Sequence, residues 1–367
     1  MDEWVEAADG RVLVLLGAGA SKPNLPTSAQ LLEEVSTHLD ATLTGDLTVH
    51  WLWRAIREQV EKIRVESGDI EDAYEAVRTL SYQDSDPTRY WIDGFTPFDF
   101  YLDDERGRRL RSQDAEFICA MLKDRSVDVL AKSAKGAPLE HFEALLRAPK
   151  VGVVALNYDD LLEKAAAMYA IPLATGAAQW DGGFAWTYPP ESSHLLKVHG
   201  SYLWRSSRVL NPGVDGLPNV GLYEVSAPIE AAPNKRMDST VVFGAGLKLT
   251  PHGPFPALMR AFTDHLEEAE LLVAVGYRFA EEHISAAIYR WAALDPRRRL
   301  MIVDPSPKLD PPFHGDTYGA LLSALWEDYR DPSSGVPGYA GSTGENRFRV
   351  VKQGVVEAFP TLFRGAH

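Results

Sequence analysis

Short apolar runs recur along the chain and are separated by amphipathic stretches. They occupy six segments: 12–16, 151–156, 195–198, 240–243, 271–275 and 300–303. The runs are rich in Val, Leu and Ile and almost unbroken, which is typical of strands buried on both faces of a parallel sheet. Two intervening segments carry mostly apolar residues at helical spacing: Leu258, Phe262, His265 and Leu266, then Ile284, Ala287, Ile288 and Trp291. Strands alternating with helices predict an α/β fold, a Rossmann-like, doubly wound and mostly parallel sheet.

The interval from 29 to 148 has a different pattern, because its apolar residues fall almost entirely at helical spacing. Examples are Leu31, Leu32, Val35 and Leu39, then Ile56, Val60 and Ile63, then Ile70, Tyr74, Val77 and Leu80. We therefore expect a large helical insertion after the first strand. Residues 205–238 and 329–345 are rich in Pro and Gly and predict long loops. The expected organisation is a sheet-containing core of residues 1–28 plus 149–310, the insertion 29–148 and a C-terminal extension 311–367.

Composition excludes several classes of protein. The apolar fraction of 45% is that of a globular chain rather than a disordered one. A net charge of −15 argues against a general nucleic-acid-binding surface, which needs an excess of Lys and Arg. The one cysteine, Cys119, excludes an intramolecular disulfide and a four-cysteine zinc site, and its helical surroundings predict a buried small hydrophobe.

The first residues are acidic, with Asp2, Glu3 and Glu6, and they lack the basic start of a signal peptide. No apolar run approaches the roughly 20 residues needed to span a bilayer. We expect a cytoplasmic protein that does not contact a membrane.

Polar groups follow three of the predicted strands, where open α/β sheets bind their ligands. The first group, Gly17-Ala18-Gly19-Ala20-Ser21, has the glycines of a turn that brings backbone N–H groups close to a phosphate. Ser21 adds a hydroxyl group that can donate a hydrogen bond or cap the turn. The third glycine of the usual dinucleotide fingerprint is absent, so an ordinary strand-to-helix turn remains an alternative.

The second and third groups are Asn157-Tyr158-Asp159 and Val198-His199-Gly200. Asn and Asp are preferred helix caps, and capping explains one of these two residues but does not need both. A single histidine is more often structural than catalytic. A histidine side chain nevertheless suits a general base acting on water or a ribose hydroxyl.

The order of these motifs resembles the sirtuin family. Residues 241–245 (Val-Val-Phe-Gly-Ala) are similar to the sirtuin Val-x-Phe-Gly-Glu strand, and residues 271–276 resemble the strand that leads into the second NAD-contacting glycine turn of that family. Five landmarks in the same order extend over residues 12–305. The resemblance implies a Rossmann-like NAD-binding core.

Several differences separate the chain from the sirtuin deacylases. It lacks the four zinc-binding cysteines, Ala245 stands in place of the glutamate of the acyl-lysine strand, and residues 23–28 differ from the segment that usually follows the first glycines. Residues 155–159 and 276–284 instead resemble a divergent bacterial sirtuin-like branch whose members hydrolyse NAD in antiphage defence. Arg278 stands where that branch often has serine.

The resemblance implies an NAD hydrolase that releases nicotinamide and ADP-ribose, with NAD as substrate and with neither a catalytic metal nor structural zinc. The expected catalytic residues are Asn157, Asp159 and His199. The expected NAD-binding residues are Gly17, Ala18, Gly19, Ser21, Gly276, Tyr277 and Asp304, the last of which ends a strand where acidic residues contact a ribose.

Two other functions stay open at this point. One is a regulatory or structural subunit of a defence complex that binds NAD or ADP-ribose without turnover, and the other is an NAD-dependent protein deacylase. The resemblance also implies a homo-oligomer and raises a HerA-type ATPase or another defence-system subunit as a partner.

Overall fold

The computed structural model describes residues 2–8, 11–22, 24–45, 47–63, 69–81, 105–210, 218–226, 239–241, 253–279, 281–307 and 347–364. These residues divide into two compact units. One unit comprises 1–22, 137–224 and 249–367, and the other comprises 23–136 and 225–248.

The first unit contains a seven-stranded sheet with the order β10-β9-β8-β1-β2-β4-β3, in which every described pairing is parallel. The strands are β1 (Val12–Leu16), β2 (Val151–Ala155), β3 (Leu173–Ala174), β4 (Ser193–Lys197), β8 (Leu271–Val275), β9 (Arg299–Val303) and β10 (Phe348–Val351). On one side of β1 the chain forms β2, then the edge strand β3, then β4 between them, and it returns to β8 on the other side of β1. This order confirms the predicted doubly wound sheet and places its switch point between β1 and β8.

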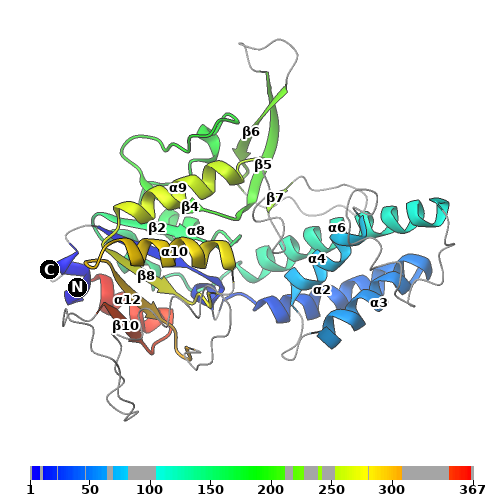
Figure 1. Ribbon diagram of the computed structural model, residues 1–367, viewed down its shortest axis with the longest axis horizontal. Helices are drawn as coiled ribbons and strands as arrows, with labels where there is room; N and C mark the ends of the chain where they lie inside the picture. Colours follow the sequence, from blue (N-terminus) through cyan, green and yellow to red (C-terminus); the bar gives the residue numbers. More distant parts are fainter. Residues whose placement is uncertain are drawn as a thin grey trace. The chain divides into compact units, whose positions relative to one another are not determined.

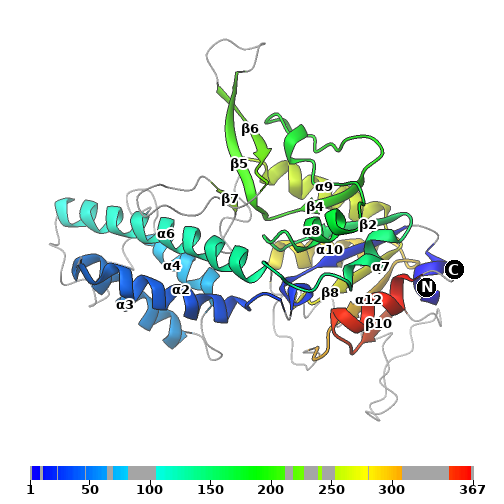
Figure 2. The same cartoon turned by 180° about the vertical axis from the view of Figure 1, so that it is seen from behind.

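Helices cover both faces of this sheet, with α9 and α10 on one face and α7, α8 and α12 on the other (Figures 1 and 2). The helical elements of this unit are α1 (Glu3–Ala7), η1 (Ala18–Ser21), α7 (Phe142–Arg147), α8 (Leu161–Met168), η4 (Ala177–Gln179), α9 (Phe255–Glu268), α10 (Glu282–Leu294) and α12 (Val355–Phe363). All five residues of β1 and all five of β8 are buried. Burial on both faces explains why these strands are continuous apolar runs in the sequence.

The second unit is mostly helical, as the sequence predicts. Its helices are α2 (Ser28–Thr42), η2 (Leu43–Gly45), α3 (Leu47–Ile63), α4 (Ile70–Ser81) and α6 (Glu105–Ser133). A capping box starts α2, in which the Thr27 hydroxyl accepts from Gln30 N and the Gln30 side chain accepts from Thr27 N. Cys119 on α6 is buried, which confirms its prediction as a core residue.

The predicted loop at 205–238 is wrong over its first part. Strands β5 (Gly200–Leu210) and β6 (Pro218–Glu224) form an antiparallel hairpin, with a register from Trp204↔Glu224 to Leu210↔Pro218. The prolines and glycines suggested a loop, but Pro218 occupies the first position of its strand, where a missing N–H is tolerated. The rest of that interval, apart from a few residues, lies outside the described structure.

The predicted buried strand at 240–243 is also placed differently. The structure has a short strand β7 (Ser239–Val241) outside the seven-stranded sheet, and residues 242–250 are not among the described ones. The similarity noted for 241–245 and the predicted loop at 329–345 therefore fall almost entirely outside the described residues. Strand β10, inside the predicted C-terminal extension, pairs with β9. Among the helices described, none has the length and apolar character needed to cross a bilayer.

Candidate functional site

The residues singled out in the sequence lie at one edge of the sheet. In the register, Leu16 is paired with both Ala155 and Val275, and the pairs Ala155↔Lys197 and Val275↔Val303 lie at the same level. The carboxyl ends of the parallel strands therefore share one edge. The turns after β1, β2, β4, β8 and β9 begin there, and these turns carry all the predicted site residues.

Two glycine turns pack directly against each other at the switch point. Gly17 N donates to Val275 O and Gly19 N donates to Gly276 O, both at 2.9 Å. A Cβ on Gly17 would lie 2.7 Å from Gly276 O, and a Cβ on Gly276 would lie 2.4 Å from the backbone of Gly19. Gly276 also has a φ of +58°, which disfavours any other residue. The glycines thus allow close contact between two backbones.

This packing alters the role expected for the first turn. The N–H groups of Gly17 and Gly19 are used inside the protein, so they do not point freely toward a phosphate. Ala18 between them is exposed at the edge of the sheet. Sequence reasoning identified the need for glycine but assigned it to a sharp turn and a phosphate contact, not to packing against a second glycine turn.

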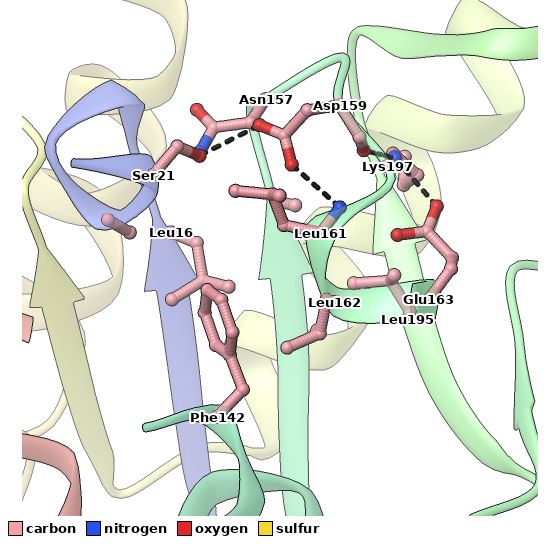
Figure 3. A pocket seen from close by; sticks show the side chains of 12 residues that line it. Leu16, Ser21, Phe142, Asn157, Asp159, Leu161, Leu162, Glu163, Leu195 and Lys197 are labelled. Carbon is pink, nitrogen blue, oxygen red and sulfur yellow. Dashed lines mark hydrogen bonds and ion pairs between the residues drawn. The ribbon is translucent and has the colours of Figure 1, made fainter. Parts of the chain in front are cut away.

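A hydrogen-bonded chain links the turn after β1 to the turn after β2 (Figure 3). The Asn157 Nδ2 group donates to Gly17 O at 2.9 Å and to Ser21 Oγ at 2.8 Å. Ser21 Oγ in turn donates to Asp159 Oδ2 at 2.7 Å, and Asp159 Oδ1 accepts from Leu161 N at 3.1 Å. The structure therefore brings these three predicted residues together, and Asp159, which precedes the N-cap residue Asp160, accepts from the first N–H of α8. Asp159 positions the loop in this arrangement.

His199 lies in the turn between β4 and β5 and is 2% exposed. Its Nδ1 atom lies 3.1 Å from Leu156 O. A carbonyl oxygen only accepts hydrogen bonds, so Nδ1 carries the proton and the Nε2 atom is left with a lone pair in the neutral ring. Nε2 lies 3.0 Å from Glu281 Oε2. An imidazole fixed by a backbone carbonyl, with a carboxylate near its other nitrogen, has the form of an oriented general base.

An ion pair between the buried Lys197 and the partly buried Glu163 lies beside the Asn157 chain, and sequence reasoning missed it. Lys197 is 1% exposed, and its Nζ donates to Glu163 Oε1 at 2.7 Å and to Asp159 O. Burial raises the pKa of Glu163, and the Lys197 ammonium opposes this rise. Both side chains line a small pocket together with Ser21 and Asn157 (Figure 3). The available signal was a lysine inside an apolar strand, since a buried lysine needs a partner.

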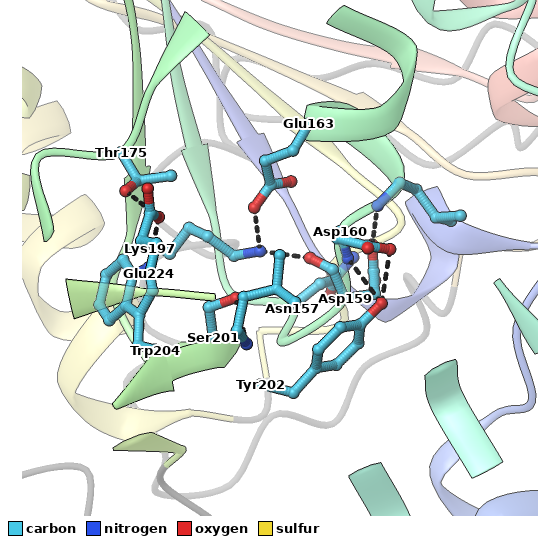
Figure 4. Close-up of polar contacts among 12 residues, drawn as sticks. Asn157, Asp159, Asp160, Glu163, Thr175, Lys197, Ser201, Tyr202, Trp204 and Glu224 are labelled. Carbon is cyan, nitrogen blue, oxygen red and sulfur yellow. Dashed lines mark hydrogen bonds and ion pairs between the residues drawn. The ribbon is translucent and has the colours of Figure 1, made fainter. Parts of the chain in front are cut away.

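Tyr202 on β5 supports the start of α8 from the other side (Figure 4). Its hydroxyl donates to Asp160 Oδ1 at 2.5 Å and accepts from Asp160 N at 3.2 Å. Lys164 Nζ lies 2.8 Å from the same carboxylate oxygen. Burial is the main cause that raises the pKa of Tyr202, and the nearby Asp160 carboxylate raises the pKa further. The hydroxyl is therefore a proton donor that holds the Asn157–Asp160 turn against the hairpin.

Two further predicted residues, Tyr277 and Asp304, lie outside the hydrogen-bonded contacts of Asn157 and His199. The ring of Tyr277 is buried in the apolar core against Phe279, so only its backbone belongs to the glycine turn. Burial, more than the nearby Glu281, raises the pKa of Tyr277. Asp304 ends β9 as expected, and its Oδ1 accepts from Ser306 N at 2.8 Å.

Two residues near His199 were not selected from the sequence. Glu281 occupies the N-cap position of α10 and His283 lies in its first turn, and His283 Nε2 is 3.8 Å from the Glu281 carboxylate. The ligand atoms of His199, Glu281 and His283 all lie within 4.8 Å of one another. The expectation that no metal takes part stays a prediction, and this cluster bears directly on it.

These positions coincide with a known domain type. Residues 151–329 match the SIR2-like domain. The match covers just under half of the chain, and it includes Asn157, His199 and the turn at Gly276 but not the turn at 17–21. Among curated proteins, none matches this chain.

Solved structures with a similar arrangement belong to SIR2 homologues. A SIR2 homologue in complex with NAD is 13% identical, with 99% of this chain and 93% of that chain covered and a TM-score of 0.44. A sirtuin studied for substrate affinity is 12% identical, with 99% and 97% covered and a TM-score of 0.38. The assignment of the fold rests on the strand order of the chain itself rather than on these distant likenesses.

Proposed function

We propose that this chain is an NAD glycohydrolase that cleaves the bond between nicotinamide and ribose. The observation that carries the proposal is the junction of two glycine turns with Asn157 and His199 at the switch point of a doubly wound sheet. Dinucleotides bind at such switch points. The match of residues 151–329 to the SIR2-like domain supports the same ligand, since a SIR2 homologue has been solved with NAD.

The dinucleotide would lie over the carboxyl ends of β1 and β8. There the turns at Gly17 and Gly276 pack against each other, and Ala18, between Gly17 and Gly19, is exposed. Ala18 and the start of η1 would face the pyrophosphate. Asp304, at the end of β9, would accept a hydrogen bond from the adenosine ribose, as acidic residues do at such strand ends.

The chemistry needs only water and a base. The C1′–N bond of the nicotinamide ribose breaks, its electron pair neutralises the pyridinium, and neutral nicotinamide leaves. A water molecule attacks C1′ and loses a proton to His199 Nε2, so the product is ADP-ribose. Glu281, 3.0 Å from Nε2, stabilises the imidazolium that forms. Asn157 would hold the ribose or the water while it also braces the first glycine turn.

The test is to incubate the purified chain with NAD and to measure the released nicotinamide by chromatography. We expect His199→Gln to reduce the rate by about 10²- to 10⁴-fold, the usual contribution of a general base. Asn157→Ala removes the two hydrogen bonds to the glycine turn, so we expect weaker NAD binding as well as a lower rate. His194→Gln is the matched control, because His194 is an exposed histidine on β4, the strand that leads into the His199 turn.

Unchanged nicotinamide release by His199→Gln in a folded protein would refute the proposed mechanism. Tight NAD binding without turnover by the wild-type chain would instead favour a regulatory NAD-binding subunit. Cleavage that requires an acylated peptide would favour a deacylase. The proposal includes the role that the sequence resemblance implies, namely NAD depletion in antiphage defence by a homo-oligomer.

A further inference from the structure

Three potential metal ligands converge beside the proposed NAD site. His199 extends from the turn after β4, whereas Glu281 and His283 come from the start of α10. The His199 Nε2 and His283 Nε2 atoms lie 3.0 and 3.8 Å from Glu281 Oε2. The side chains are only 3%, 19% and 12% exposed for His199, Glu281 and His283. Two imidazoles and a carboxylate are thus held together and shielded from water.

The His199 ring is oriented as a metal ligand is. Metal-bound histidines usually donate their second ring N–H to a carbonyl or carboxylate, and here Nδ1 faces Leu156 O at 3.1 Å. Nε2 is buried and, within the described part of the chain, it makes no hydrogen bond although Glu281 Oε2 is 3.0 Å away. The two atoms are close, but the ring does not point at the oxygen as a hydrogen bond requires.

A cation shared by His199 Nε2 and Glu281 Oε2 explains why these two atoms are close but do not form a hydrogen bond. Two ligands of one ion both point at the ion and not at each other. For tetrahedral zinc with bonds of 2.0–2.1 Å, neighbouring ligand atoms lie about 3.3 Å apart. The two separations from Glu281 Oε2, 3.0 and 3.8 Å, lie on either side of this value. A single proton can join only one pair of these atoms, whereas a cation joins all three.

We propose that His199, Glu281 and His283 form a binding site for a divalent first-row transition cation. Zn²⁺ is the ion used to test the site. Two imidazoles and one carboxylate favour such cations over Mg²⁺ or Ca²⁺, which prefer oxygen ligands alone. A bound cation takes the lone pair of His199 Nε2, so it inhibits NAD hydrolysis. This second part rests on the proposed function, whereas the binding itself does not.

Calorimetry measures Zn²⁺ binding to the full chain after a chelator has removed any metal. In a second assay, the visible absorption of bound Co²⁺ shows whether the site has a low coordination number. We expect one high-affinity Zn²⁺ per chain and no comparable binding of Mg²⁺. Loss of one ligand should weaken Zn²⁺ binding by more than the 10- to 100-fold typical of second-shell changes. The variants are Glu281→Gln and His283→Gln, and His194→Gln is the control that keeps full affinity.

Thermal melting of each metal-free variant checks that it folds, and His283→Gln provides the second variant if Glu281→Gln does not. Zn²⁺ affinity that is the same in wild type and in both folded variants would overturn the site. So would a wild-type chain that binds no Zn²⁺ at micromolar concentration.

The rate of nicotinamide release, measured with and without Zn²⁺, tests the inhibitory part. We expect Zn²⁺ to inhibit the wild type, and we expect His283→Gln to need a concentration higher by the same factor as its loss of affinity. Acceleration by Zn²⁺ would refute inhibition. Zn²⁺ binding at these ligands in a chain that never cleaves NAD would refute the proposed function and leave the metal site intact.

Discussion

Replacing the glycines at the switch point should separate two energetic costs that coincide at Gly276. Gly276 has a positive φ and no room for a Cβ. Gly17 has an ordinary φ of −96° but is equally crowded, with Gly276 O 2.7 Å from the added atom. Gly253, in the same compact unit, has a φ of +69° but its nearest neighbour would be 3.8 Å away. These three residues therefore isolate backbone strain, crowding and their sum.

The magnitudes follow from these local geometries. Left-handed backbone costs an alanine about 1–2 kcal/mol, and inserting a methyl group into a packed site costs about 1–3 kcal/mol. We expect losses of about 1–2 kcal/mol for Gly253→Ala, about 1–3 kcal/mol for Gly17→Ala and about 2–5 kcal/mol for Gly276→Ala. The variants at 17 and 276 also push the two turns apart, so they should weaken NAD binding, whereas Gly253→Ala should not.

Urea unfolding measures the stabilities, and calorimetric titration with NAD measures the binding. The reasoning fails if Gly276→Ala is no less stable than Gly253→Ala, because crowding against Gly19 would then cost nothing. The proposed position of NAD over these two turns is refuted if Gly17→Ala and Gly276→Ala bind NAD with the affinity of the wild type.

Three further predictions concern other groups. Lys197→Met leaves Glu163 without its buried partner and should cost about 3–5 kcal/mol. Burial raises the pKa of Glu163 in the folded state, so the loss should be larger at pH 8 than at pH 5, where a greater share of the carboxyl is protonated. Equal losses in urea unfolding at both pH values would contradict this. Tyr202→Phe removes the hydroxyl that pairs with the buried Asp160 and should cost about 1–3 kcal/mol by the same assay, whereas a stability within error of wild type would show that the bond contributes nothing net. Burial raises the pKa of Cys119 to about 12, so a thiol reagent should label it only after unfolding, and rapid labelling of the native chain would show that the thiol is accessible.

The sheet was readable from the sequence because its strands are buried on both faces. The runs at 12–16, 151–156, 271–275 and 300–303 match β1, β2, β8 and β9 within a residue at either end. The hairpin of β5 and β6 was not readable, since Pro and Gly residues in and around it resemble loop signals. Its pairing depends on a partner strand, which local composition does not reveal.

The positions of the polar site groups were also predictable, but their partners were not. Asn157, Asp159 and His199 follow buried runs, and the register places the ends of those runs at one edge. The bond of Asp159 to Ser21 and the use of Gly17 N and Gly19 N inside the protein depend on neighbours more than 100 residues away.

By itself the sequence determined the alternation of strands and helices and the end of each strand that bears the polar residues. Periodicity and glycine placement are local properties, so one chain suffices to read them. Only the tertiary structure decided that Gly276 packs against Gly19, that Lys197 neutralises Glu163, and that Glu281 and His283 face His199. Those contacts form only when distant segments are brought to one sheet edge. Their contributions to stability depend on how deeply the charges are buried and how closely the backbones approach, and neither quantity is a local property of the sequence.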